Sequence, residues 1–374
     1  MKKIAVIGAS YLQLPLVKKA KEMGLEVHCF AWEEGAVCKT IADYFYPLSI
    51  LEKEAILTIC QDVQIDAITT IASDTTVLTV NYVAEKMGLV SNEDAYSAIT
   101  TNKYLMRQCF TENGIPSPRY AQSRGEVPAS INSFEYPLIV KPTDRSGSRG
   151  VEKVYAPGDV QQAITNACAE SFQKEAIIEE YIGGREISVE SLSYQGEHHI
   201  LQLTDKVTTG EPHFVELEHH QPSTITGDLR DKVQEVVCRA LTALHIKYGA
   251  AHSELKITDE GTIKVIEIGA RMGGDFIGSD LVRLSTGYDF LEGVIQVALG
   301  HFTPPRQTIH RHAGVYFLSQ ETAWVKPIIE NHNAYPEIVE AAITDTVLRP
   351  LTSSGERSGY FIYQADQTFQ VNHT

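Results

Sequence analysis

Two carboxylates on a predicted β-hairpin constrain this chain more than any other feature. Glu254 and Glu267 lie thirteen residues apart, and each is part of a run that alternates apolar and polar residues. The segment 258–261, Thr-Asp-Glu-Gly, is typical of a tight turn, so two antiparallel strands would bring the carboxylates side by side. Neighbouring carboxylates repel each other unless a cation lies between them. The hairpin therefore predicts a site for Mg²⁺, with Mn²⁺ as a substitute, that shares its ligands with water and phosphate. A solvated acidic hairpin is the alternative.

An arginine and two glycines follow the second of these strands. Arg271 comes four residues after Glu267, and Gly273 and Gly274 come directly afterwards. Glycines let backbone N–H groups approach an anion, and a guanidinium binds a carboxylate or phosphate through two parallel hydrogen bonds. Beside a divalent cation, these groups indicate chemistry on a nucleoside triphosphate. Arg271, Gly273 and Gly274 would hold a carboxylate or a developing oxyanion.

Two segments upstream have features of a nucleotide site. A strand that ends at Lys141 and Pro142 precedes the loop 143–151, which is rich in Gly and Ser and can fold its N–H groups over phosphates. The spacing is not that of a Walker loop, and an ordinary mobile turn is the alternative. A second strand then runs into the segment 179–182, Glu-Glu-Tyr-Ile, whose extended backbone can meet the edge of an adenine.

The order of these pieces resembles that of the ATP-grasp superfamily, and the resemblance covers roughly residues 1–300. It implies that Lys103 and Lys141 contact the phosphates of ATP. It implies roles for four further groups: a loop of Ser146, Gly147, Ser148, Gly150 and Val151 over the phosphates; an adenine hinge of Glu179, Glu180, Tyr181 and Ile182; Glu186 on the ribose; and Glu254 and Glu267 on Mg²⁺. For Lys103, which lies on a predicted helix, a solvated surface position is the alternative.

One position departs from the superfamily pattern. Many members have Asn two residues after the second metal-binding Glu, whereas this chain has Gly269. The runs 267–275 and 216–223 resemble the branch of L-amino acid ligases. That resemblance implies that Glu216, His219 and Asp275 help to form an amino-acid pocket. An incidental loop histidine and an aspartate that leads into a helix are the alternatives.

Composition excludes several classes of partner. The 374 residues carry a formal net charge of −16, which disfavours binding to nucleic acid and to anionic membranes. The sequence has neither a transmembrane run nor a signal-peptide pattern. Its six cysteines are scattered without metal-type spacing, so we expect reduced thiols in a cytoplasmic protein.

The expected fold is α/β: an ATP-grasp fold with an N-terminal Rossmann-like parallel sheet, a small lid and a large mixed sheet. The first 92 residues alternate strands with helices, as a parallel sheet requires. A long helix from about Asn92 to Asn113 would follow. Further along the chain we expect a helix from about Ser279 to Val297 and strands near 313–318 and 359–365. The expected organisation is an N-terminal βαβ domain (1–92), a helical linker (93–136), the lid (137–204), the large subdomain with the metal site (205–310) and C-terminal strands that pack on it (311–374).

The resemblance also implies an activity. It is the ligation of a carboxylate to an amine through an acylphosphate, with release of ADP and phosphate. Amino acids are the expected small-molecule substrates, a dipeptide or an amino-acid conjugate is the expected product, and a homodimer is one allowed assembly. A biotin-carboxylase-like or purine-pathway ligase and a non-catalytic ATP-binding sensor are the alternatives.

Overall fold

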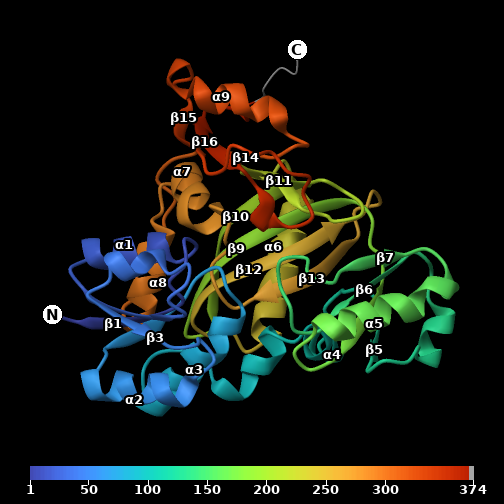
Figure 1. Cartoon of the computed structure of the whole chain (residues 1–374), viewed down its shortest axis with the longest axis horizontal. Coiled ribbons are helices and arrows are strands. Elements are labelled where there is room, and N and C mark those ends of the chain that lie inside the picture. Colours follow the sequence, from blue (N-terminus) through green and yellow to red (C-terminus); the bar gives the residue numbers. More distant parts are fainter. Residues whose placement is uncertain (370–374) are drawn as a thin grey trace.

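The structure is a computed structural model that describes residues 1–369 (Figure 1). The last five residues of the expected C-terminal segment 311–374 lie outside this description. Strands of the described residues form three sheets, two of four strands and one of eight. Within residues 1–369, no helix combines the length and the apolar character that crossing a bilayer would need.

The N-terminal sheet is wholly parallel, as the alternation of strands and helices predicts. Its strands are β1 (Lys3–Ile7), β2 (Glu26–Ala31), β3 (Tyr44–Pro47) and β4 (Ala67–Thr69), in the order β3-β2-β1-β4, and its helices are α1 (Leu14–Glu22), α2 (Lys53–Val63) and α3 (Thr75–Met87). Along β1, Ile4 and Val6 enter a core with α1. Ala5 and Ile7 enter a second core with α2 and α3. Burial on both faces explains the continuous apolar run of β1.

A helix from much later in the chain packs on the same sheet. α8 (Phe290–Ala298) places Phe290, Val294 and Ile295 in the core that also contains β1 and α1. Figure 1 shows α8 beside α1 at this sheet. The N-terminal segment therefore shares its hydrophobic core with the later half of the chain.

The prediction of a single helix from about Ser279 to Val297 is wrong. The chain forms a π-helical turn (Ile277–Leu281), then α7 (Val282–Thr286), and then α8. Gly287 ends α7 with φ +78°, and a Cβ there would lie 2.1 Å from Thr308 Oγ1. Asp289 then begins α8 by accepting a hydrogen bond from the Glu292 N–H.

The long helix expected between Asn92 and Asn113 is also interrupted. A 3₁₀ segment (Asp94–Thr100) is followed by α4 (Lys103–Glu112). Asn102 has an extended backbone, and its side chain accepts hydrogen bonds from the N–H groups of Tyr104 and Leu105. This N-cap makes Lys103 the first residue of a new helix.

The lid is a four-stranded sheet covered by one helix. It contains β5 (Tyr120–Ser123), β6 (Leu138–Pro142), β7 (Glu152–Val154), β8 (Ala176–Glu180) and the helix α5 (Val160–Glu170), with the strand order β5-β8-β6-β7. Leu138 and Val140 pack against Val160 and Ile164 in its core. The lid sheet ends at β8, before the expected boundary at 204, because the next two strands pair elsewhere.

The large sheet has eight strands, is antiparallel rather than mixed, and forms the centre of the molecule (Figure 1). Its order is β13-β12-β9-β10-β11-β14-β16-β15, with β9 (Arg185–Tyr194), β10 (Glu197–Thr208), β11 (Glu216–Gln221), β12 (Gly249–Ile257), β13 (Ile263–Gly269), β14 (His312–Leu318), β15 (Ile338–Ile343) and β16 (Gly359–Ala365). α6 (Gly227–Ala243) packs Val233, Val237 and Leu241 onto this sheet, while α9 (Lys326–Glu330) packs beside β15. Both predicted C-terminal strands, β14 and β16, are present, and together with β15 they extend the sheet.

Candidate active site

A cavity of about 530 Å³ lies where the three sheets meet. Of the residues predicted to form the site, the following line it: Lys103, Lys141, Ser146, Gly147, Ser148, Val151, Glu179, Glu180, Tyr181, Ile182, Glu186, Glu216, His219, Glu254, Glu267, Arg271, Gly274 and Asp275. Gly150 and Gly273 are not among the lining residues. The structure thus gathers nearly all of the predicted residues from five stretches of the chain into one cavity.

The predicted hairpin pairs the two carboxylates directly. Glu254 on β12 lies opposite Glu267 on β13, and a shift of register follows Glu254. Both side chains are about one-quarter exposed, and each forms an ion pair with a lysine: Lys206 Nζ lies 2.8 Å from Glu254 and Lys103 Nζ lies 2.8 Å from Glu267. Their hard oxygen donors fit Mg²⁺ when phosphate and water complete its shell. Within residues 1–369, no third acidic residue, His or Cys joins them in a cluster that could hold a metal ion.

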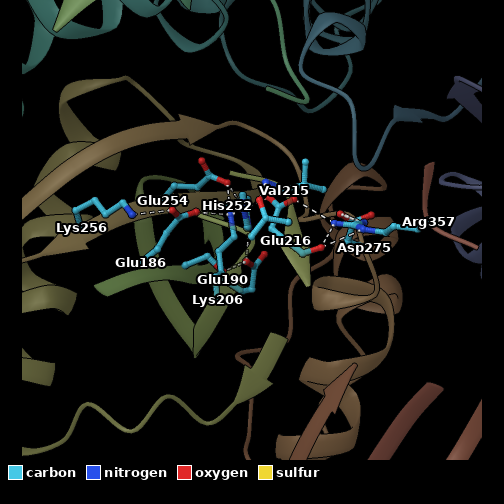
Figure 2. A network of polar contacts seen from close by, with 12 residues as sticks. Glu186, Glu190, Lys206, Val215, Glu216, His252, Glu254, Lys256, Asp275 and Arg357 are labelled. Atoms are coloured by element: carbon cyan, nitrogen blue, oxygen red, sulfur yellow. Dashed lines mark hydrogen bonds and ion pairs between the residues drawn. The ribbon is translucent and has the colours of Figure 1, made fainter. Parts of the chain in front are cut away.

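Lys206 is a functional candidate that the sequence reasoning missed. Its ammonium lies 3.0 Å from Glu186, 3.3 Å from Glu216 and 2.8 Å from Glu254. Burial disfavours its charged form, but the three carboxylates outweigh burial and hold the pKa of Lys206 well above its ordinary value. In Figure 2 this network continues from Lys256 at one end to Arg357 at the other. The sequence contained one signal for Lys206, because it is a lysine on the inward face of a strand that is otherwise largely buried.

Lys141 is fixed within the lid sheet by a buried acid. Its Nζ lies 2.7 Å from Glu179, which also lies 2.6 Å from Arg107 Nε and is 3% exposed. Burial alone would raise the pKa of Glu179, but Arg107 and Lys141 lower it. Because both carboxylate oxygens face these cations, the Glu179 side chain anchors Lys141.

The predicted hinge and phosphate loop line the same cavity as Lys141. In the hinge, Tyr181 is covered by Lys153, whose Nζ lies 3.5 Å from the ring centroid, and the Tyr181 N–H donates to Pro137. In the loop, residues 146–149 are exposed, and the Lys103 ammonium donates to the Arg145 carbonyl at 2.6 Å. Few packing contacts therefore fix the loop, as its small polar residues predict.

Arg271 and Gly273 are already engaged within the protein. The Arg271 guanidinium donates from Nε to Asp74 Oδ1 at 2.8 Å and from Nη2 to Asp74 Oδ2 at 3.0 Å. The Gly273 N–H donates to Glu190, which is fully buried and also bonds His252. The oxyanion role predicted for Gly273 is therefore unsupported in this arrangement, because its only N–H is bonded away from the cavity.

The other end of the cavity contains a histidine without a partner. His219 is 1% exposed, and neither ring nitrogen has a hydrogen-bond partner. Burial, helped by Lys206, holds the pKa of His219 well below its ordinary value, so the ring is neutral at pH 7. A buried polar side chain normally has a hydrogen-bond partner. For His219, a ligand in the cavity is the available partner.

Arg357 joins the two acidic residues predicted for the substrate pocket. Its guanidinium lies 2.8 Å from Asp275 and 3.1 Å from Glu216, and it stacks over Phe317. Arg357 follows the 3₁₀ segment Ser354–Glu356, which supplies one wall of the cavity. The sequence offered no local signal for Arg357, since it lies 141 residues after Glu216.

The chain is similar to known proteins in sequence and in fold. Residues 134–280 match the family profile described as an ATP-grasp domain. The chain contains an ATP-grasp domain. It is also similar over 98% of its length to the solved L-amino acid ligase from Bacillus licheniformis, with a TM-score of 0.81, 23% identity and 94% of that chain covered. The predicted ATP-grasp fold is thereby confirmed.

The chain also matches curated proteins over part of their length. A formate-dependent phosphoribosylglycinamide formyltransferase from Sulfurisphaera tokodaii is 28% identical over 257 residues, which are 65% of this chain and 64% of that protein. A D-alanine–D-alanine ligase from Flavobacterium johnsoniae is 30% identical over 190 residues, which are 47% of this chain and 57% of that protein. The chain thus spans less than two thirds of the length of either relative.

Proposed function

We propose that this protein is an ATP-dependent carboxylate–amine ligase that forms an amide through an acylphosphate and releases ADP and phosphate. The observation that carries the proposal is the pairing of Glu254 with Glu267 in a cavity that also contains Lys103, Lys141 and Arg271. Two carboxylates among several cations suit phosphoryl transfer, in which positioning and charge neutralisation supply most of the catalysis. The names of the similar ligases support the same class.

The proposed reaction has two chemical steps. A carboxylate oxygen of the first substrate attacks the γ-phosphorus of ATP, and the bond from that phosphorus to ADP breaks. The amine nitrogen of the second substrate then attacks the acyl carbon and loses a proton, and phosphate leaves with the bonding electrons. Neither step needs a nucleophilic side chain.

Different residues of the cavity have different roles in the proposed reaction. Lys103 and Lys141 would neutralise phosphate charge, the lid loop would exclude water, and Arg271 would hold the substrate carboxylate or acylphosphate. Glu254 and Glu267 would hold Mg²⁺ or Mn²⁺, which when bound lowers the cost of charge on the phosphates. In the lid, the backbone of Glu180 to Ile182 would bind adenine.

The substrate end favours an amino acid. Glu216 and Asp275 are held on the wall by Arg357, and the neutral, unpartnered His219 lies beside them. Carboxylates and a neutral imidazole accept hydrogen bonds, so they suit an ammonium group on the substrate. A reducing, cytoplasmic setting is part of the proposal and is supported by the six free cysteines.

A screen of acids and amines tests the proposal. Purified protein is incubated with ATP, Mg²⁺ and all pairs of the common amino acids, phosphate release is measured, and products are identified by mass spectrometry. Formate and bicarbonate are included, because one relative is named for a formate-dependent reaction. An amide product with stoichiometric phosphate supports the proposal. Turnover that depends only on bicarbonate or formate would favour the other ligase class, and ATP binding without turnover would favour a sensor.

A further inference from the structure

Asp74 bonds Arg271 instead of capping its own helix. It occupies the N-cap position of α3, where an aspartate normally accepts a hydrogen bond from the first turn, yet its side chain makes no capping bond. Both oxygens instead bind the Arg271 guanidinium at 2.8 and 3.0 Å, and Asp74 is 9% exposed. The side chain of an N-terminal residue therefore bonds a residue that lies 197 positions away in the chain.

Gly269 provides the room for this pair. A Cβ at Gly269 would lie 2.4 Å from Asp74 Oδ1 and 3.0 Å from Arg271 Nε. The asparagine expected at this position would therefore collide with the ion pair. Asp74 does not replace that asparagine as a third metal ligand, because it forms no metal-type cluster with Glu254 and Glu267 among the described residues. The ion pair of Asp74 and Arg271 occupies the space that a side chain at position 269 would need, which explains the glycine there.

The backbone around Asp74 is also attached to the strand end that carries Arg271. The Ala72 N–H donates to the Met272 carbonyl at 3.1 Å, and a Cβ at Gly274 would lie 3.3 Å from Ala72 Cβ. The Gln13 side chain fixes the same turn by donating to the Ile71 carbonyl at 2.8 Å. Two bonded segments therefore set the position of the Asp74 carboxylate before any ligand binds.

We infer that Asp74 is a positioning residue that orients Arg271 toward the substrate anion, and that Gly269 is required for this contact. Asp74 accepts from Nε and from one side of Nη2, and Nη1 donates a longer hydrogen bond, at 3.4 Å, to the Met272 carbonyl. The outer edge between Nη1 and Nη2 is therefore the one available to a carboxylate or acylphosphate in the cavity. The inference rests on the proposed ligase function, and it adds the N-terminal domain to the machinery of that site.

Asp74→Asn tests the inference because it keeps the shape and removes the charge. We expect kcat to fall by about tenfold to a hundredfold, as for a misplaced catalytic group, while the KM for ATP stays near the wild-type value. Asp289→Asn is the matched control. Asp289 caps α8 and bonds Lys19 on α1, so it also joins distant segments but lies outside the cavity. It should lower the melting temperature without changing kcat.

Gly269→Ala provides a second, independent variant. Its methyl group should displace Asp74 and lower kcat in the same way, and the double variant with Asp74→Asn should be no worse than the more damaged single variant. Binding of ADP, measured by calorimetry, reports folded protein in each case. Wild-type kcat in either folded single variant, or independent losses that multiply, would overturn the inference. Wild-type protein that releases no phosphate with any acid and amine would instead overturn the proposed function on which it rests.

Discussion

The two ends of the cavity differ in whether their buried polar side chains have partners within the protein. At the phosphate end, each predicted acid is bonded to a protein cation: Glu267 to Lys103, Glu254 to Lys206, and Glu179 to Lys141. At the substrate end, Glu216 and Asp275 are likewise paired with Arg357, but His219, which is 1% exposed, has no hydrogen-bond partner for either nitrogen. The charged groups of both regions are therefore paired before a ligand arrives, and only the second region leaves a buried imidazole without a partner among the described residues.

This difference predicts that the nucleotide and the substrate are bound in different ways. A metal–nucleotide complex entering the phosphate end exchanges existing ion pairs for new ones, because the lysines would move from carboxylates to phosphates and the metal would take their place. A substrate entering the other end supplies a hydrogen bond that the protein lacks, which removes the cost of a buried, unsatisfied group. Variants at the phosphate end should therefore affect turnover most, and variants at the substrate end should affect selectivity.

The largest expected effect is that of Glu267→Gln. Loss of a metal-binding carboxylate should cost several kcal/mol in the transition state, on the order of 10³-fold in kcat, without loss of the fold. Phosphate release is the measurement. Glu260→Gln, an exposed change in the turn of the same hairpin, is the control and should be neutral. Near wild-type release from folded Glu267→Gln would reject the metal assignment.

Arg271→Lys should have the second-largest effect. We expect the rate of ligation to fall by about 10²-fold while ADP still binds. Lysine retains the charge but cannot reproduce a planar fork that bonds Asp74 on one edge and a substrate on the other. Steady-state kinetics and ADP titration measure the two effects. Arg283→Lys, on the exposed side of α7, is the matched control. Equal loss of ADP binding would place Arg271 in the nucleotide site instead.

His219→Ala probes the substrate end and should have a smaller effect. We expect the KM of the amino-acid substrate to rise by about tenfold, the cost of one buried hydrogen bond, or the substrate preference to shift. The KM for ATP should stay nearly constant. His310→Ala, at an exposed position, is the control. The pocket assignment fails if His219→Ala weakens both substrates equally or neither of them.

The smallest expected effect is that of ATP on the mobility of the lid loop. Trypsin should cleave near Arg145 or Arg149 in the free protein, and ATP with Mg²⁺ should slow that cleavage several-fold as the loop closes. Arg306, in an exposed segment outside the cavity, serves as the internal control site. Cleavage that ATP fails to slow would count against a loop that covers phosphates.

The part of this site that the sequence predicts is the part built from local pattern. Alternation and a turn set the register of the hairpin, so the pairing of Glu254 with Glu267 follows from neighbouring residues. The order of Lys141, the Gly and Ser loop and the hinge follows from resemblance to a known fold. These residues do line one cavity, although their individual roles stay predictions.

The missed residues contact the site from distant parts of the chain. Asp74 and Arg357 meet their partners across 197 and 141 residues, and Lys206 reaches three acids on different strands. A single sequence has no local feature that reports such contacts. The interrupted helices were missed for a different reason, since caps at Asn102 and Asp289 overrode otherwise helical patterns.

The packing of α8 on the N-terminal sheet has a consequence for how this chain can be divided. Because Phe290, Val294 and Ile295 complete the core of β1 and α1, removal of the first 92 residues would leave an apolar helix face in water. The N-terminal unit is therefore not a detachable module, and fusions or exchanges with related chains need to carry α8 along with it. Heat or denaturant should unfold the two together in one cooperative transition.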